Sequence, residues 1–368
     1  MHGKMQTVSS DGLLSRRTLL TGAAGLVSAA ALSSARALAQ SPAPAKTPAP
    51  AEIAPGVFTL IAPGDRIWCN IAWVIFRDHI LVLDAGSLSE AHMYLPIIQA
   101  TADKPIRFVL NTHHHGDHSY GNEFWMNHGA TVMGNAKIVA EFARDEPWRL
   151  NHFPVIEPAA LWKAEAAATH IQLPSLLLSA PTVFDDGTQR VELLHLGAAH
   201  TAADTLAWLP KQRILVTGDI VVNGPYNVMW DAHVLSWIDV LAKAEALGAR
   251  LIVPGHGAPG PGSIVGGQRA YFVALREAVK AIVARGGDAR SLRASVGSIA
   301  KSLLANPRIQ RWVVPVKFPI PELLTLSGQL GCFYTELTGK AYVAADSPEH
   351  SQARSLAGLC CGALKMFE

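Results

Sequence analysis

The sequence predicts an α/β fold in which two β-sheets lie between outer helices. Short β-rich runs occur in two groups, and each group is followed by a stretch whose apolar residues have helical spacing. Of the 368 residues, 49% are hydrophobic and 16% are charged, so apolar side chains suffice to fill the core of a large domain. This order of strands, helix, strands and helix favours two sheets with helices outside them.

The first group of β-rich runs is separated by polar or Gly/Pro turns, as expected for strands. Its runs cover 57–61, 71–76, 79–86 and 106–111. We expect one helix at 87–100 and another at 135–145.

The second group covers 182–184, 190–197, 205–210 and 213–219, with turns at 185–188 and 210–213. An amphipathic helix is predicted at 233–248, a further strand at 250–257 and a long closing helix at 266–287. The remaining residues, 288–368, are expected to form a helical extension packed on the core domain at 56–287.

The N-terminus has the layout of a signal peptide at 1–39. Arg16 and Arg17 precede a short run rich in Ala and Gly, and Ala37 and Ala39 form a small-x-small cleavage site. The paired arginines resemble a twin-arginine export signal. An ordinary signal or a single membrane anchor is the alternative, but the apolar run is shorter than the roughly 20 residues that a span needs.

We therefore expect cleavage after Ala39, a periplasmic or secreted protein, and no stable insertion into a membrane. The segment 40–55, rich in Pro and Ala, is expected to be a tether that builds no core.

Charge and cysteine usage exclude some classes of protein. The formal net charge is +2 and no basic stripe with interleaved aromatic residues is present, which argues against a nucleic-acid partner. The cysteines, Cys69, Cys332, Cys360 and Cys361, lack the spacing of a zinc finger. A disulfide between Cys69 and one of the later three remains open.

Four histidines and one aspartate crowd into residues 113–118, directly after the predicted strand 106–111. Alternate residues near a strand end point the same way, so His113 and His115 can share one metal ion while His114 points elsewhere. Asp117 and His118 would face a neighbouring position. The alternative is a surface tract of histidines without a ligand.

Three further polar residues directly follow apolar strands. His200, Asp219 and His256 each lie beside Gly or Ala, where the side chain would project at one edge of the sheets. Any one of them could be a capping Asp or a hydrogen-bonded loop His. Their occurrence in order behind the histidine cluster indicates a metal site.

Together these motifs resemble those of the metallo-β-lactamase superfamily, over about 55–285. The resemblance implies an αββα sandwich, with 56–287 as the catalytic domain. It assigns His113, His115 and His200 to the first metal, and Asp117, His118 and His256 to the second, with Asp219 bridging both. "LVLDAG" supplies Asp84 as the acid that orients a ligand.

Imidazole-rich ligands without a redox requirement favour two Zn²⁺ ions per chain, although iron or manganese binds similar donors. Two such ions would lower the pKa of a bridging water toward about 7. The resulting hydroxide would attack a carbonyl polarised by the first metal, and the second would stabilise the leaving group. Asp117 would orient the nucleophile or pass a proton.

The resemblance leaves the small-molecule substrate open among esters, lactones, thioesters and β-lactams. The β-lactamase subclasses have Cys or Ser where this chain has Asp219, although a β-lactamase proper remains an alternative. The signal peptide, "APGVF", Asp219 and "YTELTGK" are most similar to exported zinc hydrolases associated with sulfur oxidation or quinoprotein relays.

Substrate contacts are expected on two loops, 62–70 and 221–233. Trp68 lies on the first; Asn223, Tyr226 and Trp230 lie on the second, where Tyr226 could donate to an oxyanion. Plain loop packing is the alternative for all four. No role is assigned to the remaining loop histidines, among which His195 and His233 are the candidates for contacts behind the ligands.

Two other functions compete with a hydrolase. Persulfide dioxygenases on this fold use one iron, but the second set of ligands is intact here, which favours the hydrolase. A metal-binding accessory protein of a periplasmic redox system is the other alternative, and a nuclease is the weakest.

Overall fold

The computed structural model describes residues 49–62, 69–152, 159–225, 227–314 and 325–342. The expected signal peptide and most of the tether lie outside these residues. So do two of the expected substrate contacts, Trp68 and Tyr226, and the cysteines Cys360 and Cys361.

The first sheet has seven strands in the order β1-β2-β3-β4-β5-β6-β7. Strands β1 to β4 pair antiparallel, and β4 to β7 pair parallel. The strands are β1 (Ala51–Ala54), β2 (Val57–Leu60), β3 (Ile71–Ile75), β4 (Ile80–Leu83), β5 (Ile106–Leu110), β6 (Thr131–Asn135) and β7 (Leu176–Leu178).

The second sheet has six strands in the order β13-β12-β11-β10-β9-β8, and only the β11–β12 pair is parallel. The strands are β8 (Thr182–Asp185), β9 (Arg190–Leu194), β10 (Leu206–Leu209), β11 (Ile214–Val216), β12 (Leu251–Val253) and β13 (Gly260–Pro261).

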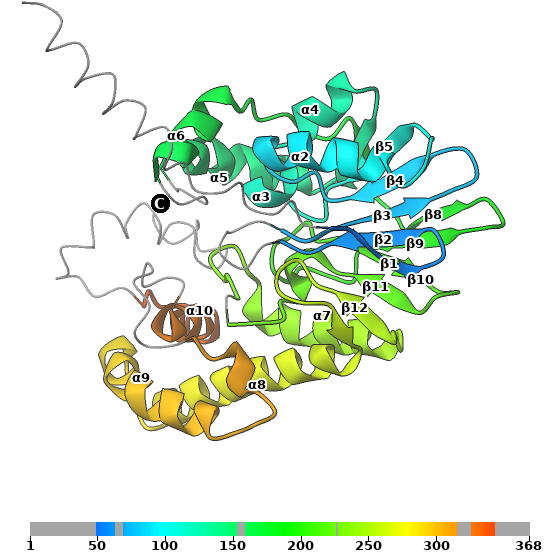
Figure 1. Cartoon of the computed structure of the whole chain (residues 1–368). Coiled ribbons are helices and arrows are strands. Elements are labelled where there is room, and N and C mark those ends of the chain that lie inside the picture. The colour runs from blue at the N-terminus through cyan, green and yellow to red at the C-terminus, as the bar shows by residue number, and fades with distance from the viewer. Residues whose placement is uncertain (1–48, 63–68, 153–158, 226, 315–324, 343–368) are drawn as a thin grey trace, which may run out of the picture. The chain divides into compact units, whose positions relative to one another are not determined.

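Helices flank both sheets (Figure 1). Those near the first sheet are α2 (Leu88–Gln99), α3 (Gly116–Ser119), α4 (Asn122–Asn127), α5 (Ile138–His152) and α6 (Ala159–Ala168). Later in the chain come the short 3-10 helices η1 (Gly218–Ile220) and η2 (Gln310–Trp312), and the helices α7 (Val234–Ala246), α8 (Ser263–Ala284), α9 (Ala289–Leu304) and α10 (Leu326–Thr338). Among the described residues, no helix is both long and apolar enough to cross a membrane.

Period-two alternation divides the apolar side chains of the sheets between two layers. In β3, Ala72 and Val74 belong to the core between the sheets, together with Leu193 and Leu209 of the second sheet. The intervening Trp73 packs instead against α2 and α4 in an outer core. A second outer core joins β10, β11 and β12 to α7 and α8. The predicted sandwich of two sheets between helical layers is confirmed.

Most of the expected strands and helices are present, but the first strand is a correction. The tether predicted at 40–55 contains β1, whose Ala51–Ala54 pairs antiparallel with β2. Main-chain hydrogen bonds to β2 stabilise this strand, which the Pro/Ala-rich composition of 40–55 does not indicate. Strand β6 was also not predicted, because "TVMGN" is an irregular mixture of residue types although all but its first residue are buried.

The predicted C-terminal extension contributes α9 and α10, which pack onto α7 and α8. Leu292, Leu303, Leu330 and Phe333 belong to the same buried core as Trp237 of α7. Gln329 of α10 donates to the carbonyl of Asn227 at 3.0 Å. The extension therefore supports the loop that follows Asp219.

We expect Phe333→Ala to lower the free energy of unfolding by about 3–5 kcal/mol, because Phe333 is fully buried between helices. Chemical denaturation of the full chain measures the change. Leu304→Ala is the matched control, since Leu304 is 48% exposed on α9 and should change stability little. Equal effects for the two variants would contradict the packing of α10 on the core.

Candidate metal centre

The predicted ligands come together because four strands end at the same edge of the sandwich. The loop after β5 carries residues 113–118, and the segment after β9 carries His200. Asp219 and His256 follow the parallel strands β11 and β12, so their backbones emerge side by side.

The first ligand group consists of His113, His115, His200 and Asp219, all buried, with candidate ligand atoms within 4.8 Å of one another. His200 Nε2 lies 3.0 Å from His115 Nδ1. It lies 3.6 Å from Asp219 Oδ2. Three imidazoles and a carboxylate at this spacing can surround one cation.

The second group consists of Asp117, His118 and His256. His256 Nε2 lies 3.1 Å from Asp117 Oδ2. The Asp219 carboxylate reaches this group too, with Oδ1 3.3 Å from His118 Nε2 and Oδ2 3.4 Å from His256 Nε2. Asp219 thus lies between the two groups, where a bridging ligand is needed.

Within the part of the chain that the structure describes, three buried atoms at the centre have no hydrogen-bond partner: His113 Nε2, His118 Nε2 and Asp219 Oδ1. Leaving such atoms unpaired costs about 1–3 kcal/mol each. Their convergence from three different segments fits the binding of divalent cations. The donor set of imidazoles and carboxylates suits zinc, and also iron or manganese.

Burial prepares two of the imidazoles for a metal, because only the neutral ring can coordinate. Removal from water lowers the pKa of His113, and lowers that of His200 to about 3. Burial alone would raise the pKa of Asp219, but His256 and His118 hold it well below its usual range. The carboxylate is therefore ionised.

Two glycines allow Asp219 to enter the site. A Cβ on Gly255 would overlap Asp219 Oδ1, and a Cβ on Gly218, whose φ is +50°, would overlap the Thr112 side chain. Gly218 of "VTGD" and Gly255 of "PGHG" are therefore needed because the two strand ends approach each other closely.

Asp84 lies behind His118, as the resemblance implied. Its Oδ2 accepts a hydrogen bond from His118 Nδ1 at 2.8 Å, which leaves Nε2 directed at the site. Its Oδ1 accepts from the Thr112 backbone at 2.7 Å. Asp84 adopts a φ of +77°, a strained conformation for a residue with a Cβ.

Asp231 does the same for His115, and sequence reasoning missed it. Asp231 Oδ2 lies 2.8 Å from His115 Nε2, which directs Nδ1 toward His200. Arg149 donates to the same oxygen at 2.6 Å. Burial would raise the pKa of Asp231, but Arg149 and His115 hold it well below its usual range. The only signal was an acid within the apolar segment "MWDAH".

His114 belongs to neither of the two ligand groups, as expected from its position between His113 and His115, although its ring centroid lies 4.7 Å from that of His115. It is fully buried, with Nε2 3.6 Å from Asp231 Oδ2 and 3.7 Å from Glu146 Oε1. His195 and His233 make no hydrogen bond to a ligand side chain within the described structure. His195 donates from Nδ1 to the carbonyl of Asp204.

The two described substrate-contact candidates favour the packing alternative. Trp230 is 8% exposed, and its indole Nε1 lies 3.3 Å from His115 Nε2. The Asn223 amide donates to Ala258 and accepts from Arg311. Because both side chains contact protein groups, they hold the loop 221–233 in place.

The ligands differ in exposure. The His256 side chain is 22% exposed, that of Asp117 is 10% exposed and that of His115 is 8% exposed, whereas those of His118 and His200 are at most 1% exposed. His256 is therefore the most exposed of the candidate ligands.

The sequence model of the family described as "Metallo-beta-lactamase superfamily" matches residues 69–256, slightly more than half of the chain, and spans every ligand. The chain belongs to the metallo-β-lactamase superfamily. The matched segment contains the His and Asp clusters that are able to bind metal.

Individual relatives are distant. Beta-lactamase-like protein 2 homolog of Caenorhabditis elegans is 24% identical over 180 residues, which are 48% of this chain and 52% of that protein. The chain thus spans about half the length of this curated relative. The metallo-beta-lactamase from Pontibacter korlensis is 19% identical with a TM-score of 0.50, covering 61% of this chain and 97% of its own. VMB-1 is 18% identical with a TM-score of 0.51, covering 62% and 98%. At such identities the structural likeness shows the fold.

We expect zinc binding to the metal-free protein to release protons and to strengthen as pH rises. Burial would lower the pKa of His256, but Asp219 and Asp117 raise it to about 10; the pKa of His118 is raised as well. Both rings are therefore protonated at neutral pH without metal and must lose a proton to coordinate. Calorimetric titration in two buffers of different ionisation enthalpy measures the release. Equal heats in both buffers would refute it.

Proposed function

We propose that the protein is a dinuclear zinc hydrolase that cleaves an ester, lactone, thioester or β-lactam. The observation that carries the proposal is the position of Asp219, whose carboxylate lies within 3.6 Å of ligand atoms from both groups. One carboxylate shared by two sets of imidazoles supports two ions held side by side. A single-iron centre would need only the first group.

When bound, the two ions would acidify a coordinated water and polarise the scissile carbonyl. Asp117 and His256 form the exposed side of the centre, where the substrate would enter. Besides its role as a ligand, the Asp117 carboxylate would hold a nucleophilic water by hydrogen bonding or accept its proton. Asp84 and Asp231 would keep the rings of His118 and His115 directed at the ions throughout the reaction.

The first test is the metal content of the full chain, purified without chelator or histidine tag, together with a hydrolysis panel. The panel contains nitrocefin, a lactone, a thioester and a phosphodiester. About two zinc ions per chain and turnover of one acyl substrate would support the proposal. One iron per chain without hydrolysis would contradict the proposal and favour the dioxygenase alternative. Cleavage of the phosphodiester alone would show that the substrate is a phosphodiester and not an acyl compound.

We also propose that residues 1–39 direct export, because paired arginines precede an apolar run and a small-x-small site. Cell fractionation and N-terminal sequencing of the product test this. An N-terminus at Gln40 in the periplasm is expected, and replacing Arg16 and Arg17 by Lys should retain the precursor in the cytoplasm. An uncleaved chain in the membrane would favour the anchor.

A further inference from the structure

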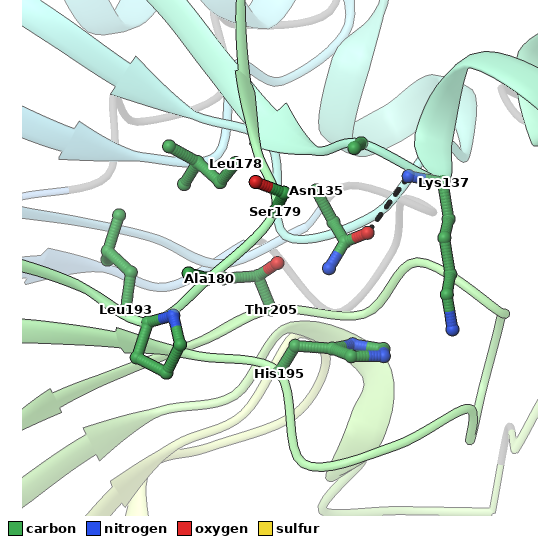
Figure 2. Close-up of a pocket in the computed structure, with 10 residues that line it drawn as sticks. Asn135, Lys137, Leu178, Ser179, Ala180, Leu193, His195 and Thr205 are labelled. Carbon is green, nitrogen blue, oxygen red and sulfur yellow. Dashed lines mark hydrogen bonds between the residues drawn. The ribbon is translucent and has the colours of Figure 1, made fainter.

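A cavity of about 260 Å³ lies near the metal centre but includes none of its ligands. One wall comes from the end of β6 and the residue before α5, with Asn135 and Lys137. The opposite wall comes from the second sheet, with His195 and Thr205, and the segment 178–181 after β7 closes the side (Figure 2).

Thr205 gives this cavity a built polar position. The residue is 3% exposed, and its hydroxyl has no hydrogen-bond partner within the described structure. Figure 2 shows the side chain of Thr205, the residue before β10 of the second sheet, extending toward Asn135 at the end of β6 of the first. An unpaired buried hydroxyl costs about 1–3 kcal/mol, so a ligand that bonds to it relieves that cost.

The other polar groups favour a negative charge. Lys137 is exposed and makes no ion pair with a described carboxylate, and no lining residue is acidic. Asn135 Oδ1 accepts from the Lys137 backbone N–H at 2.9 Å, which leaves the Asn135 amide nitrogen as a donor. The N-terminus of the 15-residue helix α5 begins at the next residue, Ile138, and adds positive potential.

Ser179 and His195 are the remaining polar residues of the lining, and its apolar part is formed by Ala136, Leu178, Ala180, Pro181 and Leu193. A fully hydrated ion such as phosphate gains nothing from these surfaces, whereas a short hydrocarbon chain does. Pockets for drug-sized ligands begin at about 300 Å³, so this volume suits a smaller molecule.

We propose that the cavity binds a small aliphatic monocarboxylate. Its carboxylate lies among Lys137, Asn135 and Thr205, and its hydrocarbon chain lies against Leu178 and Leu193. The proposal does not depend on the reaction at the metal centre. The cavity is connected to that centre through one hydrogen bond, from the Thr205 backbone N–H to the carbonyl of Thr112, the residue before His113.

Butyrate is the probe, titrated into the metal-loaded full chain and followed through backbone amide chemical shifts. Saturable shifts at residues 178–180 and 205 are expected, because butyrate at a metal would instead perturb the amides around 113–118 and 256. Butyramide and inorganic phosphate should cause no saturable shift at 178–180. Equal binding of either compound, or butyrate shifts confined to the metal ligands, would overturn the proposal.

Two variants make the test specific. Lys137→Gln should weaken butyrate binding about tenfold, because it removes a charge-assisted hydrogen bond. Lys301→Gln removes the same charge from the exposed face of α9 and is the matched control. Thr205→Val should weaken binding several-fold without lowering the melting temperature, since the hydroxyl has no hydrogen-bond partner among the described residues. Wild-type affinity in Lys137→Gln would overturn the proposal.

Discussion

Asp219→Ala should reduce turnover by at least about a thousandfold and lower the metal content below two ions per chain. The carboxylate lies between the two ligand groups, 3.3 Å from His118 Nε2 and 3.6 Å from His200 Nε2. Its loss removes a ligand from both sites. It also removes the negative charge that lies between the two positively charged ions and reduces their repulsion. Metal analysis and steady-state kinetics on the reactive panel substrate measure the two effects.

The matched control is Asp239→Ala, which removes a carboxylate from the exposed face of α7. It should keep full metal content and turnover. An Asp219→Ala protein that also keeps two ions and full turnover would disprove the bridging role. Loss of turnover with both ions retained would instead place Asp219 in the reaction and not in metal retention.

The positions of the candidate ligands were predictable from local patterns, whereas their division between two metal ions came from the resemblance to the superfamily. His113, Asp219 and His256 each lie three residues after the last residue of an apolar strand, and His200 lies six residues after β9. The ends of neighbouring strands meet at a sheet edge. The fold was predictable for the same reason, since period-two and helical spacing are properties of short segments. Neither inference needed to know which strand pairs with which.

What the sequence did not reveal depends on contacts between distant segments. Asp231 acquires its role from His115 and Arg149, which lie 116 and 82 residues earlier in the chain. For Trp230 the sequence left substrate contact and loop packing open, because an aromatic residue in a loop near a site has the same local pattern whether it is exposed or buried. In the structure this side chain is buried and packs against His115.

Strand β1 illustrates the same limit in the fold. "AEIA" carries little β-propensity, and its stability comes from pairing with Val57–Leu60 across a short turn. Composition described the residues correctly but could not show the partner strand.

Asp231→Asn should weaken metal binding at the first site by about 10–100-fold while leaving the second group assembled. The carboxylate accepts from His115 Nε2 and thereby directs Nδ1 toward His200, 3.0 Å away. An amide of the same shape can present its NH₂ group to the ring, which favours the wrong tautomer of His115. Competition with a chromophoric chelator measures the affinity of the two sites.

The same substitution should lower the free energy of unfolding by about 3 kcal/mol, because it leaves Arg149 buried with one fewer negative partner. The double variant Asp231→Asn with Arg149→Met separates the two effects. It removes the buried Asp231–Arg149 pair. Glu146 also loses Arg149, but burial raises the pKa of this carboxyl and Tyr120 still donates a hydrogen bond to it. Stability should therefore recover in part relative to Asp231→Asn while first-site affinity stays weak. If affinity recovered together with stability, Asp231 would act through the general stability of the loop. Persistent weak binding in a stable protein would establish that the carboxylate positions His115.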